Sequence, residues 1–211
     1  FDYAVRLMEL PQGLFGLSLA TYLLPTLAGL AADKKFPEFR SMLGQGLSHL
    51  VFLNLIASIL LVILAEPIIR LIFEHGKFTA YDVEMTAGPL QAYAFGLVFY
   101  SAIKVLQPAF YTIDKRFIPM FVSIGIIVLN VSLNSFTVFV MKWDHTALAW
   151  ATALGLLINF LVLYLSMRKF AGGLETRSLT RSLIRLVVAT SLMGAVCHGL
   201  KISLLANWGE M

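Results

Sequence analysis

The stretch MLGQGLSHLVFLNLIASILLVILA at residues 42–65 decides the fold class, because none of its side chains is Asp, Glu, Lys or Arg. A helix of about 20 apolar residues is long enough to cross the hydrocarbon core of a bilayer. Five further apolar runs lie at 3–31, 85–111, 118–141, 146–167 and 183–206. Open strands cannot satisfy their backbone groups in lipid, and these runs lack the alternation of a β-barrel. The sequence therefore predicts an all-α, polytopic transmembrane bundle with six spans.

The composition of the whole chain agrees with this class. The 211 residues are 59% hydrophobic and 13% charged, with a mean hydropathy of +0.83, whereas soluble domains carry about 25% charged residues. The net charge of +4 comes from basic residues in short connections, so nucleic acid is not an expected partner. No P-loop, nucleophile elbow or metal-ligand spacing appears, and Cys197 is the only cysteine. We therefore expect neither an enzyme nor a bound metal.

Basic residues predict the orientation of the spans. Alternate connections carry nine Lys or Arg on one side and three on the other: Lys34, Lys35, Arg40, Lys115, Arg116, Arg168, Lys169, Arg177 and Arg181 against Arg70, Lys77 and Lys142. Cytoplasmic loops are enriched in Lys and Arg. The first set is thus expected to face the cytoplasm, with both ends of the chain on the outer side.

Residues 67–82, PIIRLIFEHGKFTAYD, differ from the other connections because apolar and charged side chains alternate densely there. This pattern favours a short helix in the headgroup layer, and the alternative is an extension of the preceding span. We expect residues 1–169 to form five spans of one lobe, 170–182 a basic cytoplasmic loop, and 183–211 a further span with an outer tail. No basic segment precedes the first run, so we expect no signal peptide and a chain that is part of something longer.

Ionisable side chains within the spans are the candidates for function, because such groups are costly in lipid and normally face a wet interior. In the first run Arg6 and Glu9 are three residues apart and can form an ion pair. Gly13 and Gly16 follow on the same predicted face, where they would admit a neighbouring helix or a ligand. A guanidinium on a cavity wall suits a diphosphate, whereas a snorkelling interfacial arginine is the alternative. We also expect this run to bend at its two prolines, Pro11 and Pro25.

Lys104 lies deep in the third run, with polar residues one and two turns away that form a stripe: Tyr100, Gln107 and Tyr111. Either this lysine lines a transport path, or it is a structural residue paired with an acid from a missing part of the protein.

Amide and hydroxyl side chains recur on one face in the fourth and fifth runs. They are Asn130, Asn134 and Thr137 in the fourth, and Thr152 and Asn159 in the fifth. Such oxygens from adjacent helices can ligate a monovalent cation, or they can hydrogen-bond across the helix interface.

Three stretches together resemble one family. RLMELPQGLFGLSLATYLLPTLA at 6–28, LIFEHGKFTAYD at 71–82 and AYAFGLVFYSAIKVLQPAFYTIDKRFIP at 92–119 are similar to the MurJ (MviN) lipid II flippases, of the multidrug/oligosaccharidyl-lipid/polysaccharide exporter superfamily. The resemblance runs in order to about residue 169. It implies a fold of fourteen transmembrane helices in two lobes, of which these six spans would be the eighth to the thirteenth.

The resemblance also implies roles for individual residues. The family's cavity arginine falls on Arg6, its companion acid on Glu9, and the lysine of its KVL-P-FY stretch on Lys104, so the resemblance implies that these three are substrate-binding residues. The aspartate that the family carries before the arginine is Val5 here. Asn130, Asn134 and Thr152 fall where a sodium site has been placed in some members, although Asn134 is an acid in those proteins.

The resulting hypothesis is translocation of an undecaprenyl-diphosphate-linked peptidoglycan precursor, lipid II, across the bacterial cytoplasmic membrane by alternating access. The expected partners are this lipid-linked diphosphate, the surrounding membrane lipids and a missing amino-terminal lobe. No cofactor is expected apart from a possible sodium ion. The alternatives are export of another lipid-linked oligosaccharide or a drug, or an inactive membrane scaffold for wall synthesis.

Overall fold

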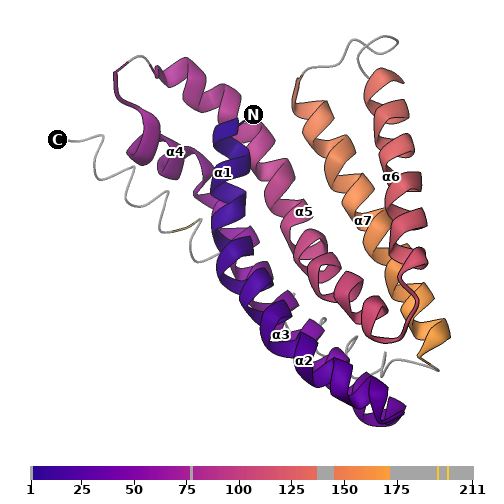
Figure 1. The fold of residues 1–211 in the computed structure, drawn as a ribbon. Coiled ribbons are helices and arrows are strands. Elements are labelled where there is room, and N and C mark those ends of the chain that lie inside the picture. Colours follow the sequence, from indigo (N-terminus) through magenta and orange to yellow (C-terminus); the bar gives the residue numbers. More distant parts are fainter. Residues whose placement is uncertain (1, 77, 137–144, 172–193, 195–198, 200–211) are drawn as a thin grey trace.

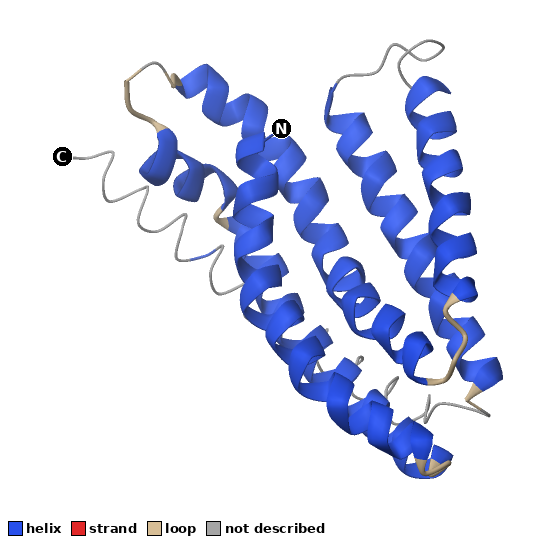
Figure 2. Ribbon diagram, in the orientation of Figure 1, coloured by secondary structure: helices blue, strands red, loops and turns tan. Residues whose placement is uncertain are grey.

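The computed structural model describes residues 2–76, 78–136 and 145–171, together with Gly194 and Gly199. Within those residues it consists of helices joined by short turns (Figure 1, Figure 2), which confirms the all-α prediction. The elements are α1 (Asp2–Pro11), the π-helix η1 (Gln12–Leu17), α2 (Ser18–Ala32), α3 (Phe36–Ile63), α4 (Ala65–Phe73), α5 (Ala80–Thr112), α6 (Phe117–Phe136) and α7 (His145–Phe170).

In the described part of the chain, five helical stretches are long and apolar enough to cross a membrane: Asp2–Ala32, Phe36–Ile63, Ala80–Thr112, Phe117–Ser135 and Thr146–Phe170. They correspond to five of the six predicted spans, and the sixth, at 183–206, falls almost entirely outside the described residues. The second span begins six residues before the predicted start because Pro37 and Glu38 favour a first helical turn that hydropathy cannot detect.

The long helix α5 lies at the centre of the bundle. It packs against α7 on one side and against α3, α2, α1 and α4 on the other (Figure 1). Its carboxy-terminal half belongs to the largest apolar cluster, in which Leu106 and Phe110 are fully buried together with Phe39 and Leu43 of α3. Almost every other described helix therefore contacts α5, and these contacts fix the position of the side chains on its remaining surface.

Small residues allow α5 and α7 to approach closely. Gly88, Ala92 and Gly96 recur every four residues along α5, and Ala149 and Ala153 of α7 are completely buried. A Cβ atom placed on Gly96 would lie 3.1 Å from Leu156 Cδ1 and 3.5 Å from the backbone Cα of Ala153. Membrane helices commonly associate through such small residues, because van der Waals contact replaces the hydrophobic effect in lipid.

The first span contains a π-helical turn that the sequence did not predict. Pro11 ends α1, η1 covers the next six residues, and α2 then continues in the same direction (Figure 1). The wider turn changes the helical phase, so the predicted shared face of the two glycines is wrong. Gly16 is buried and its Cβ position lies 3.6 Å from Ser101 Oγ of α5, whereas nothing lies within 4 Å of the Cβ position of Gly13. Pro25 lies inside α2.

The segment predicted to lie in the headgroup layer contains a separate helix, α4. Leu64 departs from helical geometry, with φ −100° and ψ 14°, and so separates α4 from α3. One face of α4 is buried through Ala65 and Ile69, while Leu71 on the other face is 86% exposed. Arg70 pairs with Glu66 at 3.1 Å and with Glu74 at 3.3 Å. This amphipathic geometry supports the interfacial helix over the extended span.

The limits predicted for this segment need correction at both ends. The helix starts at Ala65, before the predicted residue 67, and α5 already begins at Ala80. Between them Gly76 turns the chain with φ +66°. The backbone N–H and the hydroxyl of Thr79 both donate to Asp82 Oδ2, at 2.8 and 2.7 Å, in a capping box that starts α5. These local caps, rather than hydropathy, set the helix boundary.

Candidate functional site

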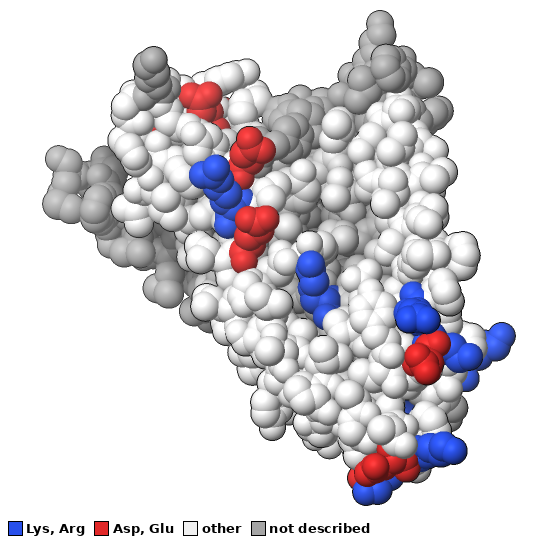
Figure 3. Space-filling view, viewed as in Figure 1, with Lys and Arg blue, Asp and Glu red and all other residues white. Residues whose placement is uncertain are grey.

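The α2–α3 turn, the α5–α6 turn and the end of α7, which were all predicted to face the cytoplasm, lie at one end of the bundle. Lys115, after α5, has its Nζ 5.6 Å from the centre of the Phe170 ring at the end of α7. A single pocket is lined by residues from the α2–α3 turn, the α5–α6 turn and Phe170. Figure 3 shows Lys and Arg gathering at this lower end, whereas most of the surface above it is uncharged. The fold therefore brings these basic connections together, and the side of the membrane that they face stays a prediction.

Lys104 lies on the exposed side of α5, in a groove of about 440 Å³ between α2 and α5. Its Nζ lies 5.1 Å from the centre of the Tyr100 ring, one turn away. Among the described residues no carboxylate lies within ion-pair distance of this lysine. The groove is otherwise mostly apolar; its lining is Leu17, Ala20, Thr21, Leu24, Pro25, Gln107, Pro108 and Tyr111 besides the lysine. Lys104 is thus a cation on the wall of a membrane-level groove.

The predicted polar stripe along α5 is only partly directed into that groove. Gln107 and Tyr111 line it together with Lys104. The Gln107 amide also donates to Ser123 Oγ of α6 at 3.4 Å, a long contact that helps to connect the two helices. One helical face therefore serves both the groove and the packing of α6.

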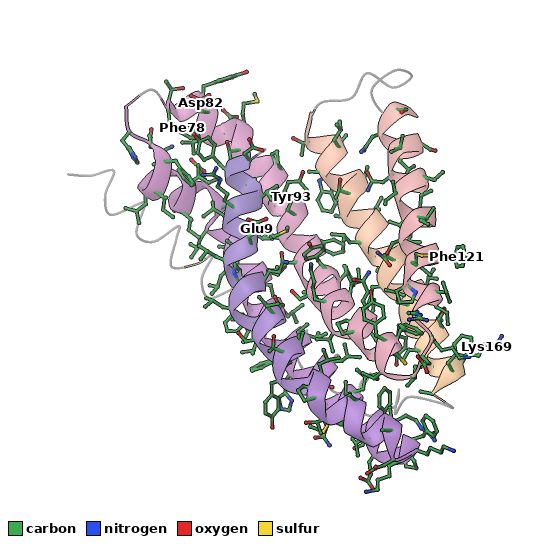
Figure 4. All side chains as sticks on the ribbon, in the orientation of Figure 1. Glu9, Phe78, Asp82, Tyr93, Phe121 and Lys169 are labelled. Atoms are coloured by element: carbon green, nitrogen blue, oxygen red, sulfur yellow. The ribbon has the colours of Figure 1, made fainter. Side chains whose placement is uncertain are left out.

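Arg6 and Glu9 project from the side of α1 that no other described helix covers. Ala4, Leu7 and Met8 face inward and are buried, whereas Arg6 and Glu9 are exposed. Figure 4 labels Glu9 on α1 and Tyr93 on the adjacent α5. The predicted ion pair is wrong, because no oxygen of Glu9 lies within 4 Å of the guanidinium in the described structure. An exposed pair gains too little energy to hold two long side chains together, so both groups stay available to another partner.

Arg6 and Lys104 lie at different depths. Arg6 is in the second turn of α1, toward the predicted outer end, and lies eleven positions before Leu17, where the Lys104 groove begins. Eleven residues correspond to about 16 Å along a helix. The α1–α2 helix and α5, which pack together, thus carry one unpaired cation each at separate levels of the membrane.

A buried polar contact that sequence reasoning missed joins α3 to α5. The Ser101 hydroxyl donates to Asn54 Oδ1 at 2.9 Å, and the Asn54 amide donates to Leu50 O at 2.9 Å. Both side chains are fully buried, and Gly16 of the π-helix lies against Ser101. One signal was available: an asparagine inside the most apolar run must find a hydrogen-bond partner in lipid.

Replacing Asn54 with alanine should lower the free energy of unfolding by about 1 kcal/mol, because the interhelical bond is lost. The measurement is SDS-induced unfolding of the intact protein in detergent micelles. Ser101→Ala should have a similar effect, and the double variant should cost clearly less than the sum of the two. Additive effects of the single substitutions would contradict a direct Asn54–Ser101 interaction.

The amides of α6 and α7 are mostly engaged in hydrogen bonds. The Asn134 amide donates to Asn130 Oδ1 at 2.8 Å, and the Thr152 hydroxyl donates to Leu148 O at 3.0 Å. Asn130 also faces α7, since its Nδ2 lies 3.0 Å from the Cβ position of Gly155. Asn134 Oδ1 and Asn159 Oδ1 are buried oxygens without a hydrogen-bond partner in the described structure. Thr137 lies outside the described residues.

Comparison with known proteins identifies related chains. The family model described as "Lipid II flippase MurJ" matches residues 1–211. A "Probable lipid II flippase MurJ" of Vibrio cholerae is 32% identical over 212 residues, covering 98% of this chain and 39% of the relative. One from Buchnera aphidicola of Acyrthosiphon pisum is 37% identical over 161 residues, covering 76% and 31%.

A solved structure shares the fold. "Lipid II flippase MurJ, inward closed conformation" superposes with a TM-score of 0.73 at 25% identity, and the match covers 100% of this chain and 47% of that one. The chain therefore spans less than half the length of the proteins it matches.

Proposed function

Because this chain belongs to the MurJ family of lipid II flippases, we propose that the intact protein moves lipid II across the cytoplasmic membrane. The family is one of membrane transporters, and the five membrane-length helices make this a multi-pass membrane protein. The proposed direction is from the cytoplasmic to the outer leaflet of a bacterial inner membrane.

The observation that carries the proposal is Lys104, a cation exposed in a groove of a membrane-spanning helix without a carboxylate partner in the described chain. Moving a diphosphate through hydrocarbon is very costly unless other charges replace its hydration. A lysine at this depth offers charge-assisted hydrogen bonds to phosphate oxygens. Arg6, nearer the outer end, would provide the next cation along the path, and Glu9 beside it would limit how tightly the anion binds there.

Alternating access can use rigid-body rocking of one lobe against the other, together with gating by a part of a lobe that changes shape. The π-turn η1 lies between the level of Arg6 and the Lys104 groove, and such turns are common at functional sites. We propose that η1 lets α1 and α2 tilt separately while α5 stays fixed by its packing. The second lobe of the cavity would come from residues beyond this chain.

The alternatives differ in what they require of these cations. A carrier of another lipid-linked oligosaccharide would use the same cations, whereas an exporter of cationic drugs would require a cavity acid in place of Lys104 and Arg6. An inactive scaffold would have no use for an unpaired lysine in a membrane-level groove. The groove therefore favours a lipid-linked anion.

A monovalent cation at Asn130, Asn134 and Thr152 stays a prediction. Asn130 Oδ1 accepts one hydrogen bond, the Thr152 hydroxyl donates to Leu148 O, and Asn134 Oδ1 has no partner in the described structure, so each of the three oxygens keeps a lone pair. We derive no step of transport through such an ion.

The proposal is tested with the intact protein in proteoliposomes that contain fluorescent lipid II. Transport of lipid II should be observed, and Lys104→Gln should slow it about tenfold because a charge-assisted contact is lost. Lys104→Arg should retain most of the rate. Lys169→Gln, which removes the same charge at the cytoplasmic end, is the matched control. Failure of the unmodified protein to move lipid II while it moves another lipid-linked sugar would assign the chain to the alternative cargo.

A further inference from the structure

A second cationic pocket, separate from the Lys104 groove, lies at the predicted cytoplasmic end. Its volume is about 410 Å³, and it is enclosed by the α2–α3 turn, the α5–α6 turn and the end of α7. Three charged residues line it: Lys34, Asp114 and Lys115. Apolar side chains of Phe36, Ile113 and Phe170 complete much of the wall. A cationic pocket with an apolar wall, next to the ends of three spans, is suited to an amphipathic ligand.

Two unusual turns place these charges. Lys34 and Asp114 have φ values of 58° and 60°, and they are the only non-glycine residues with positive φ in the described part of the chain. Both turns close in the same way, since Lys35 N donates to Leu30 O at 2.9 Å and Lys115 N donates to Phe110 O at 3.0 Å. Glycine usually occupies this left-handed position after a helix. Here charged residues occupy it instead, and both line the pocket.

The charge balance at this end strongly favours an anion. Among the described residues at this end, seven basic ones stand against three acidic ones: Lys34, Lys35, Arg40, Lys115, Arg116, Arg168 and Lys169 against Asp33, Glu38 and Asp114. Lys35 pairs with Asp33 at 3.4 Å. Neither pocket lysine, Lys34 or Lys115, has a carboxylate within ion-pair distance among the described residues. Their charges are therefore available to a ligand.

We propose that this pocket binds the phosphodiester headgroup of an anionic phospholipid from the cytoplasmic leaflet. Lys34 and Lys115 contact the phosphate, and Phe36 and Phe170 contact the glycerol and the first acyl carbons. Basic pockets between membrane helices on the cytoplasmic side bind anionic lipids in this way. The apolar wall favours a lipid over free phosphate, which would contact only the charged rim. This inference does not depend on lipid II transport.

The experiment titrates the intact protein in detergent with dioctanoyl phosphatidylglycerol, and follows binding by calorimetry at low ionic strength. Dioctanoyl phosphatidylcholine, which has no net charge, should bind at least about fivefold more weakly. Inorganic phosphate and glycerol 3-phosphate test whether the charged rim alone suffices. Equal binding of either soluble anion and of phosphatidylglycerol would overturn the assignment to a lipid.

Substitutions locate the site. Lys34→Asn with Lys115→Gln should weaken phosphatidylglycerol binding about thirtyfold, since each basic residue contributes about a fivefold effect. Arg168→Gln with Lys169→Gln removes the same charge at the same end outside the pocket (Figure 4 labels Lys169) and should change binding much less. Asp114→Asn keeps a residue that tolerates the left-handed turn and should tighten binding severalfold. Equal losses in both double variants would mean that the lipid senses diffuse surface charge and that the pocket is not a site.

Discussion

Replacing Gly96 with leucine should lower the free energy of unfolding of the intact protein by about 3 kcal/mol. The Cβ position of Gly96 lies 3.5 Å from the backbone of Ala153, and Ala153 is completely buried. A leucine side chain cannot fit there unless α5 and α7 separate, and separation gives up the dispersion contacts that hold membrane helices together. The midpoint of SDS-induced unfolding in mixed micelles measures the loss.

Two further glycine substitutions make this result interpretable. Gly96→Ala adds only the Cβ atom, which meets the movable end of Leu156 at 3.1 Å, so we expect a smaller loss. Gly125→Leu makes the same chemical change on α6, where nothing in the described structure lies within 4 Å of the Cβ position. It should leave the midpoint nearly unchanged. Equal loss at Gly96 and Gly125 would show that leucine acts through helix propensity or lipid contact, and not through the α5–α7 interface.

The α5–α7 interface matters for function because α5 carries Lys104. The apolar cluster around Leu106 and Phe110 holds one side of α5, and the small residues near Gly96 hold another. In contrast, α6 is covered mainly by α7, and Phe121 projects away from the bundle (Figure 4) with 66% of its surface exposed. The lysine thus stands on the most constrained described helix, which suits a fixed contact point in a moving transporter.

The spans could be predicted from sequence because the bilayer imposes one strong constraint on length and polarity. The ends of the spans could not be predicted in this way, because local capping interactions determine them. The Thr79–Asp82 capping box, for example, begins α5 within the segment that was expected to lie at the membrane surface. The π-turn after Pro11 was also missed. A proline predicts that the helical ladder is interrupted, but only packing decides whether the helix kinks there or widens by one residue.

The candidate site, like the fold, could be predicted from sequence only in part. Lys104 could be singled out from sequence because the cost of a membrane charge can be read from its position alone, and it lies in a groove, while its role in transport stays a prediction. The Arg6–Glu9 pair was inferred from spacing on one helix, yet spacing does not require contact when both side chains are exposed. The Asn54–Ser101 bond joins residues 47 positions apart, so no local pattern reveals it.

Arg6→Ala should reduce lipid II transport by the intact protein about a hundredfold, because a charge-assisted, bidentate contact to a diphosphate is lost. Folding should be little affected: Ala4 and Leu7 bury the inward face of α1, whereas Arg6 is exposed. Arg6→Lys should keep a measurable fraction of the rate, since it retains the charge without the planar fork. Arg168→Ala, an equal truncation at the cytoplasmic end, is the matched control. Rates are compared in proteoliposomes, and growth is compared in cells depleted of their own flippase.

The separation of Arg6 from Glu9 gives this prediction a second measurable consequence. If the two groups act on the substrate independently, the effects of Arg6→Ala and Glu9→Gln on the transport rate should multiply. The coupling energy should then stay below about 0.5 kcal/mol. A large coupling would mean that the two side chains pair in another conformation of the transport cycle, with Glu9 orienting the guanidinium. Undiminished transport by Arg6→Ala would remove Arg6 from the path and leave Lys104 as the remaining candidate cation among the described membrane-spanning helices.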